Sequence, residues 1–157
     1  MLKLRAILSA FFFGGCGVGD PPLEEIYVPA NAPLTIDITG DDYDWHIRYP
    51  GRDGQLHTAD DIEAVQDVYL PENVEIQIRL HSEDYIYVFA IPELELNQVA
   101  IPDMEFSLAF ETGAVDTFVF RGRQLCGFVH KSLRGKMVVE SKRAFAARLE
   151  EVRINAK

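Results

Sequence analysis

The feature that most constrains the fold is a series of short segments, between residues 26 and 140, in which apolar and polar residues alternate. In VEIQIRL, residues 74–80, every second residue is apolar, from Val74 to Leu80, and the residues between them are polar or charged. Because successive side chains of a β-strand point to opposite faces, this pattern predicts strands with one buried and one solvent-facing side. Most of the chain is therefore expected to form β-sheet.

Turn signals separate these segments. Residues that favour turn geometries are combined in Pro50-Gly51, Asp53-Gly54, Pro71-Glu72-Asn73 and Thr112-Gly113. The strands that we expect are residues 24–28, 34–39, 44–49, 65–70, 74–81, 86–91, 96–101, 105–111, 115–121 and 136–140. Short strands at this spacing predict an all-β protein, an antiparallel Greek-key β-sandwich or barrel.

The last segment follows a different pattern. In SKRAFAARLEEVRINAK, residues 141–157, the apolar residues Phe145, Leu149 and Val152 recur at helical spacing. Ser141 precedes them and is a residue type that caps helix N-termini. We predict a short C-terminal helix that packs on the sandwich or on a neighbouring subunit. Its basic polar face makes a role at a membrane surface the alternative.

The N-terminal residues are typical of an export signal. A basic start at residues 3–5 and an apolar run at residues 6–13, too short to span a bilayer, are followed by two glycines and Cys16. A cysteine in this position looks like a bacterial lipobox, in which the cysteine carries lipid, although Phe13 stands where leucine is usual. The alternative is an ordinary cleaved signal in which Cys16 has no role.

This interpretation divides the chain into four parts. They are a lipoprotein-type signal peptide (1–15), a Gly/Pro-rich tether (16–25), one β-domain (26–141) and a C-terminal helix and tail (142–157). A length of 157 residues and a hydrophobic content of 48% suit a single core. We expect an exported protein at the periplasmic, outer face of a membrane, held there by a lipid anchor.

Charge is distributed unevenly along the chain. Residues 16–120 hold 22 acidic residues against three arginines, a net charge of −19, whereas residues 121–157 hold ten basic residues against three glutamates, a net charge of +7. The acidic body would repel nucleic-acid phosphates, so nucleic-acid binding is not expected. It would attract a basic protein such as a soluble cytochrome. The alternative is that the acidic residues only keep an exported domain soluble.

Cys126 and His130, in LCGFVHKSLRGK, are the residues with the strongest metal-binding chemistry. A thiolate and an imidazole on one loop can bind a single copper ion if a neighbouring strand supplies a third ligand. The alternative is a small apolar cysteine and a histidine that is only hydrogen-bonded. The chain has no convincing Ser/His/Asp grouping and no Gly-rich phosphate loop, so an isolated enzyme finds little support.

Four segments in order carry a family resemblance. They are ITGDDYDWHIRYPG (38–51), DGQLHTADD (53–61), VYLPENVEIQIRLHSEDYIYVFAIPEL (68–94) and VAIPDMEFSLAFETGAVDTFVFRGRQLCGFVHKSLRGKMVVE (99–140). Together they resemble the copper-bearing domain of cytochrome c oxidase subunit II, over about residues 28–140. The resemblance implies a cupredoxin fold. It also implies a respiratory role, because that domain accepts electrons from cytochrome c at a dinuclear copper centre, CuA.

The resemblance also implies where metal ligands should lie. The family's two bridging cysteines, two histidines, methionine and carbonyl donor correspond here to Gly122, Cys126, Tyr87, His130, Leu133 and Gln124, respectively. Two of the four strong ligands are thus absent, at Tyr87 and Gly122. Because one thiolate cannot bridge two copper ions as a pair does, we expect a degenerate site that binds no metal, with mononuclear copper on Cys126 and His130 as the alternative.

Further family positions are altered. Gln124 stands where a glutamate helps bind a magnesium or manganese ion, and a neutral amide is a poorer ligand for such ions. The aromatic positions where electrons enter and cytochrome docks correspond to Tyr43 and Trp45. In the family, two transmembrane helices precede the domain, and we expect the signal and Cys16 to replace them here.

Two functions follow from the resemblance. The first is a non-catalytic, subunit II-like module of a haem-copper oxidase or related respiratory complex, which docks on membrane-embedded subunit I. Quinol oxidases, whose subunit II keeps the fold without CuA, are a precedent for this. The second is a free-standing mononuclear copper protein for electron transfer or copper handling.

Overall fold

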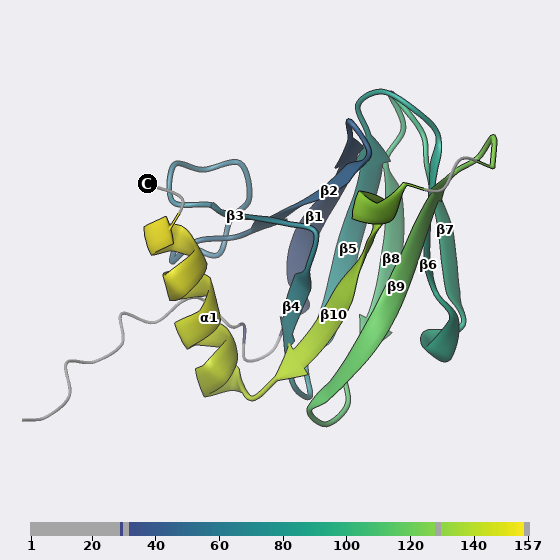
Figure 1. Ribbon diagram of the computed structural model, residues 1–157. Helices are drawn as coiled ribbons and strands as arrows, with labels where there is room; N and C mark the ends of the chain where they lie inside the picture. Colours follow the sequence, from purple (N-terminus) through teal and green to yellow (C-terminus); the bar gives the residue numbers. More distant parts are fainter. Residues whose placement is uncertain (1–28, 30–31, 128–129, 156–157) are drawn as a thin grey trace, which may run out of the picture.

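Two five-stranded sheets pack face to face, and one helix lies against one side of the pair (Figure 1). The computed structural model describes residues 29, 32–127 and 130–155. In sheet order, the first sheet holds β3 (Ile62–Val65), β2 (Asp44–Tyr49), β1 (Leu34–Asp41), β5 (Glu75–Ser82) and β8 (Phe106–Glu111). The second holds β4 (Val68–Pro71), β10 (Arg134–Glu140), β9 (Asp116–Gln124), β6 (Tyr87–Ile91) and β7 (Leu96–Ala100).

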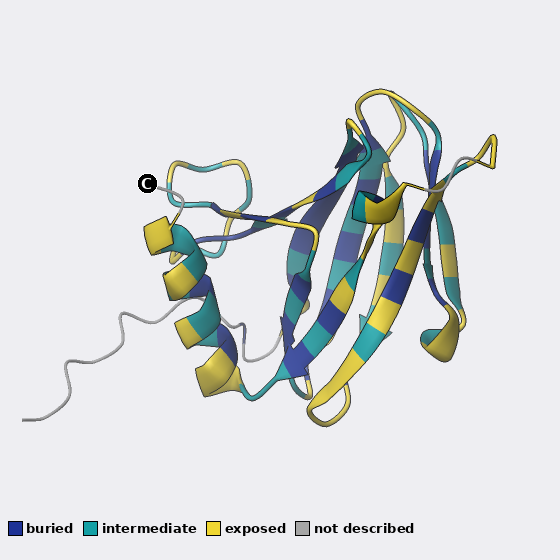
Figure 2. Cartoon of the chain, in the orientation of Figure 1, coloured by how far each residue is buried: buried dark blue, intermediate teal, exposed yellow. Residues whose placement is uncertain are grey.

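The alternating pattern places the core between the sheets. On β5, Ile76, Ile78 and Leu80 are fully buried, and the residues between them are partly exposed. Figure 2 shows the same succession of buried and less buried residues along the central strands. The prediction of a two-sheet β-sandwich with a C-terminal helix is confirmed. Burial of the apolar face of each strand is the main source of its stability.

The prediction of a single strand over residues 65–70 is wrong. The segment forms the end of β3 and most of β4, which belong to different sheets. Between them Gln66 adopts a left-handed backbone with φ 76°, and its N–H donates to the carbonyl oxygen of Trp45 at 2.7 Å. This turn carries the chain from the first sheet to the second, a change that side-chain alternation cannot report.

The expectation of a purely antiparallel sandwich is also wrong. β1 pairs with β5 in parallel, and β4 pairs with β10 in parallel. Parallel neighbours need a long crossover connection. Here the chain makes one by passing through β3 and β4, so that β5 returns to the first sheet beside β1.

Helix α1 (Lys142–Asn155) starts where the sequence predicts. The Ala144 N–H donates to Ser141 Oγ at 3.3 Å, which caps the first turn. Phe145 and Leu149 are buried, and Phe145 packs edge-on against Tyr49 at 6.2 Å between ring centroids. The helix therefore covers the side of the sandwich that β3 and β4 form (Figure 1).

Several predictions fall outside the described residues. They are the signal peptide, the lipidation at Cys16, the tether and the strand at residues 24–28. Within the described ranges, no helix is both long and apolar enough to cross a membrane.

Candidate functional site

The predicted site residues gather at one end of the sandwich, where the β1–β2 turn, the β5–β6 loop and the loop after β9 meet (Figure 1). Tyr43 lies at the centre of this group. Its ring is 5.3 Å from that of Tyr85, 6.3 Å from that of Tyr87 and 5.2 Å from that of His130, centroid to centroid. The structure thus brings together three segments that the sequence separates by tens of residues.

Tyr87, which the sequence resemblance sets at the position of a family histidine, has a fully buried side chain. The hydroxyl donates to Asp84 Oδ1 at 2.8 Å and accepts from the Tyr43 N–H at 3.2 Å. Burial raises the pKa of Tyr87, and the nearby Asp84 carboxylate raises it further against the opposing effect of the Tyr43 N–H. The phenol therefore stays protonated at neutral pH, the form in which it is a poor metal ligand.

Asp84 ties two loops together. Its Oδ2 accepts from the Asp42 N–H at 3.0 Å, while Oδ1 accepts from the Tyr85 N–H at 2.6 Å as well as from Tyr87. The β1–β2 turn is thereby held against the β5–β6 loop. Hydrogen bonds to a charged carboxylate are among the stronger polar contacts of a protein.

At Gly122, which the sequence resemblance sets at the position of the first family cysteine, there is no room for a side chain. A Cβ atom there would lie 2.5 Å from the carbonyl oxygen of Leu133 and 2.6 Å from Trp45 Nε1. Those two groups are hydrogen-bonded to each other, with Nε1 donating at 3.2 Å. The space that a thiolate at residue 122 needs is thus filled by a buried indole and by backbone.

Gly40, on the opposite sheet, also lies where neighbouring side chains leave no room for a Cβ atom. A Cβ atom at this residue would lie 2.5 Å from Cδ2 of Tyr87 and 3.3 Å from Cζ3 of Trp45. The absence of a side chain therefore lets both aromatic rings enter the end of the sandwich. Trp45 and Tyr87 then pack edge-on, with 5.7 Å between ring centroids.

His130 is exposed, and one of its ring nitrogens is engaged. Nδ1 lies 2.5 Å from Ser132 Oγ, and the Ser132 hydroxyl donates to the carbonyl oxygen of Tyr43 at 2.9 Å. Since the one hydroxyl proton is used on Tyr43, Nδ1 must donate to Ser132. In the neutral ring, Nε2 then keeps a free lone pair, which is the state that a metal ligand requires.

Cys126 is an exposed free cysteine in the turn that follows β9. Next to it, Gly127 has a left-handed backbone with φ 88°, and its N–H donates to the carbonyl oxygen of Gln124 at 3.0 Å. Gln124 ends β9 opposite Tyr87. Leu133, at the family's methionine position, is fully buried.

The remaining predicted residues differ in accessibility. Trp45, one of the two positions proposed for electron transfer, is fully buried, and Tyr43 is half-buried. The more accessible ring is that of Tyr85, 43% exposed, which the sequence argument did not single out. Within the described ranges, no three His, Cys, Asp or Glu side chains are grouped closely enough to hold a metal ion.

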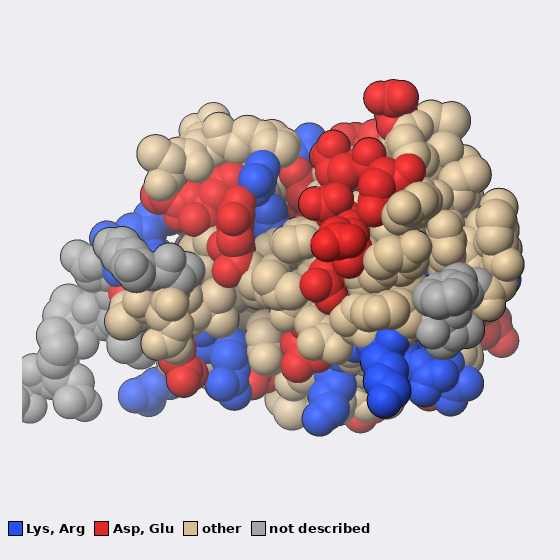
Figure 3. All heavy atoms as spheres, turned by 45° about the horizontal axis from the view of Figure 1, so that its top comes forward, with Lys and Arg blue, Asp and Glu red and all other residues tan. Residues whose placement is uncertain are grey.

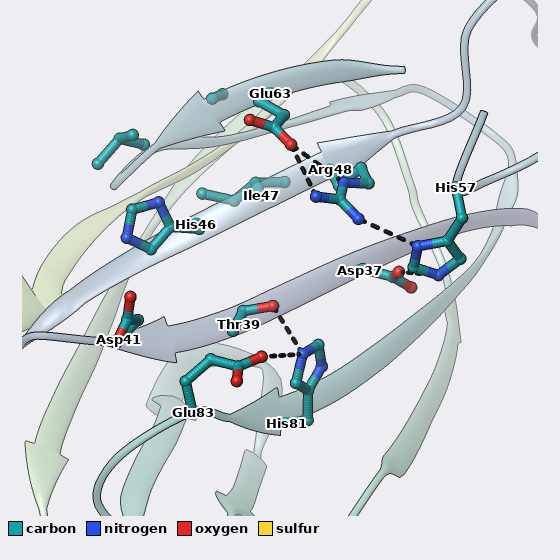
Figure 4. A pocket seen from close by; sticks show the side chains of 12 residues that line it. Asp37, Thr39, Asp41, His46, Ile47, Arg48, His57, Glu63, His81 and Glu83 are labelled. Carbon is teal, nitrogen blue, oxygen red and sulfur yellow. Dashed lines mark hydrogen bonds and ion pairs between the residues drawn. The ribbon is translucent and has the colours of Figure 1, made fainter. Parts of the chain in front are cut away.

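A second polar group, on the outer face of the first sheet, escaped sequence reasoning. Asp37, a buried residue, accepts from Arg79 Nε at 2.7 Å and from Nη2 at 2.9 Å, and its Oδ2 lies 3.1 Å from His57 Nε2 (Figure 4). His57 Nδ1 is 3.0 Å from Nη1 of Arg48. Nη2 of Arg79 is also 3.0 Å from His57 Nε2, so the imidazole ring lies between two guanidinium groups and the Asp37 carboxylate. The signal was available in the DGQLHTADD loop, which holds His57 over the sheet.

Comparison with known proteins decides the family. The profile that describes "Cytochrome C oxidase subunit II, periplasmic domain" matches residues 50–142, more than half of the chain. The chain belongs to this family. The match includes β3 to β10 and therefore Tyr87, Gly122, Cys126 and His130, whereas the β1–β2 turn of the candidate site lies before it.

Relatives in the family are distant. An alternative cytochrome c oxidase subunit 2 from Bradyrhizobium diazoefficiens is 27% identical over 148 residues, covering 80% of this chain and 53% of that protein. A cytochrome c oxidase subunit 2 from Thermostichus vulcanus is 28% identical over 144 residues, covering 89% of this chain and 39% of that protein. The chain spans about half the length, or less, of these relatives.

Solved structures show the same fold. The periplasmic domain of subunit II of cytochrome oxidase from Bradyrhizobium japonicum superposes with a TM-score of 0.67 at 23% identity, covering 82% of this chain and 99% of that one. A mixed disulfide between a thioredoxin-like protein and a cytochrome c oxidase subunit II gives a TM-score of 0.65 at 24% identity, covering 83% of this chain and 98% of that one. The chain thus has the subunit II periplasmic fold.

Proposed function

We propose that this chain is a subunit II-type periplasmic module of a haem-copper oxidase or related respiratory complex in which the CuA centre is degenerate. Its role is structural: it docks on the membrane-embedded catalytic subunit, and the redox chemistry belongs to that other chain. The observation that carries this proposal is the filled space at Gly122, where Trp45 and Leu133 meet.

The residues present do not fit a dinuclear copper centre. Such a centre needs two thiolates that bridge both metal ions. One of these positions is closed by the Trp45–Leu133 contact, and a histidine position is taken by a buried, protonated Tyr87. The hydrogen bonds of Asp84 keep these loops packed without a metal ion. We infer that the end of the sandwich is a closed scaffold.

A mononuclear copper site is the second candidate, and one observation favours it. The Ser132 contact at Nδ1 leaves His130 Nε2 free, and both His130 and Cys126 are exposed on the same loop. A thiolate and an imidazole are suitable ligands for copper. The third ligand would have to come from residues that the sequence does not identify.

The two candidates are separated by copurification and spectroscopy. The chain, tagged and expressed in its own host, is purified from detergent-solubilised membranes and examined for bound haem, copper and partner subunits. Recovery of a haem-bearing membrane subunit, with the copper content of the isolated chain near zero, is the result that we expect. A mixed-valence seven-line electron paramagnetic resonance spectrum from the isolated chain would contradict the degenerate centre.

Copper addition tests the second candidate. If the isolated chain gains an intense thiolate-to-copper absorption band that disappears in Cys126→Ala, a mononuclear site exists. His130→Gln should then weaken the band, whereas His46→Gln, a change at an exposed histidine of β2, should leave it unchanged.

A further inference from the structure

The outer face of the second sheet carries four cationic side chains on two neighbouring strands. Arg121 and Arg123 lie on β9, Arg134 and Lys136 lie on β10, and all four residues are exposed. Every second residue of both strands points outward, so the four side chains share one surface. We call these four residues the basic face.

The basic face is not neutralised by neighbouring acidic groups. Within the described ranges, none of its side chains forms an ion pair with a carboxylate. A nearby carboxylate, Asp67, accepts instead from the backbone N–H of Lys136 at 2.9 Å. The register of β9 and β10 also sets Arg121 directly opposite Arg134. Like charges in directly opposite positions destabilise a sheet, and an external anion would remove this cost.

Short apolar side chains lie between the cations. Val119, 44% exposed, is opposite Lys136, and Ala90 of β6 is beside Arg121. Long basic side chains on such a face can extend past the short ones to meet a surface. A sheet face of this composition fits an extended anionic plane better than it fits one small anion.

The loop end of the sandwich has the opposite charge. Figure 3 shows acidic side chains grouped over the upper part of the view and basic side chains along its lower edge. Asp41, Asp42, Asp44, Glu83 and Asp84 all lie at the loop end that carries the candidate site. An anionic plane would repel that end and attract the basic face, so charge complementarity selects both the contact surface and the orientation.

We propose that the basic face docks on the anionic phospholipid headgroups of the membrane beside which the domain works. This inference rests on the proposed function, because an oxidase subunit II module works at a bilayer surface. Each lysine or arginine near an anionic bilayer adds an attraction that falls off within a Debye length. Docking through this face keeps the acidic loop end away from the lipid.

Vesicle binding of the full chain tests the docking. Binding is measured on vesicles of phosphatidylcholine alone and of phosphatidylcholine with phosphatidylglycerol, at low and at high salt. We expect preference for the anionic vesicles at low salt and its loss at high salt. The double variant Arg121→Gln/Arg134→Gln should lower the partition coefficient on anionic vesicles by about thirtyfold, since two cations are removed.

Lys142→Gln/Arg143→Gln is the matched control. It removes the same charge from the first turn of α1, outside the basic face, and should change the partition coefficient by less than about twofold because attraction decays within a Debye length. All variants keep the same N-terminal residues, so any binding through that segment is equal in every sample. Thermal unfolding shows whether each variant folds.

Two outcomes overturn the proposal. If both double variants lose the same amount of binding to anionic vesicles, binding depends on net charge and not on the basic face. If the chain shows no preference for anionic vesicles, lipid is excluded as the ligand of the basic face. If an acidic protein that copurifies with the native chain is then lost in Arg121→Gln/Arg134→Gln, the basic face is a protein interface. The vesicle assay contains no oxidase subunit, so its failure is distinct from a failure to copurify with a haem-bearing subunit.

Discussion

The indole N–H of Trp45 donates to the carbonyl oxygen of Leu133 at 3.2 Å, across the space that a side chain on residue 122 would need. The contact joins β2 to the short helical turn that precedes β10, so it closes the end of the sandwich from both sheets. The space beside Gly122 is thus part of the packed core.

Gly122→Ala should destabilise the protein by about 2 kcal/mol, because the added methyl group must displace backbone and a buried indole. Gly113→Ala is the matched control: nothing lies within 4 Å of a Cβ atom there, so stability should be unchanged or slightly raised. Urea unfolding measures both. Equal stability of the two variants would show that the end of the sandwich is loosely packed.

Tyr87→Phe should cost about 1 kcal/mol at neutral pH, because the phenol loses its bonds to Asp84 and to the Tyr43 N–H. The pH dependence gives a second test. Folding raises the pKa of Tyr87, so its contribution is complete below the unfolded value of about 10 and declines as pH rises above it.

The decline is measured as the free energy of unfolding in urea, at a series of pH values from neutral to above the unfolded pKa of Tyr87. The slope of unfolding free energy against pH should be smaller in Tyr87→Phe than in the native chain. Tyr49→Phe should reduce the slope too, because burial also raises the pKa of Tyr49, whose hydroxyl accepts from the Tyr69 N–H at 2.8 Å. Identical slopes in all three proteins would contradict the assignment.

Asp37→Asn should destabilise the protein by about 2 kcal/mol, since it leaves the Arg79 guanidinium without its two-point carboxylate partner and removes the negative charge beside His57. Glu63→Gln, which removes a largely exposed partner of Arg48, should cost less than about 1 kcal/mol. Thermal unfolding distinguishes the two. A larger loss in Glu63→Gln would mean that the buried pair is not the stronger contact.

Arg134→Gln should raise stability by about 0.5 kcal/mol, because it relieves the repulsion from Arg121 across the β9–β10 pair. Lys136→Gln is the control, because Lys136 faces Val119 and no cation. Chemical denaturation at low salt measures the gain, and added salt should reduce it. A gain of the same size in Lys136→Gln would point to net charge rather than to this cross-strand pair.

Local sequence patterns were sufficient for the main elements. The alternation in residues 74–80 predicted β5, and the spacing of Phe145 and Leu149 with the capping Ser141 predicted α1. The change of sheet between β3 and β4 was missed, because a turn at Gln66 leaves the alternation on either side intact. Cys126 and His130 could be named from the sequence as candidate ligands, but the contacts around them could not be predicted.

The sequence by itself determined most of the segments that become strands and the residue types at the candidate site, because strand periodicity and residue identity are local properties of the chain. Only the tertiary structure decided that Trp45 fills the space beside Gly122, that Asp84 engages Tyr87, and that Arg121 faces Arg134 without a carboxylate partner in the described part of the chain. These relationships join residues on different strands and loops. They depend on the register and packing of the two sheets, which no local pattern encodes.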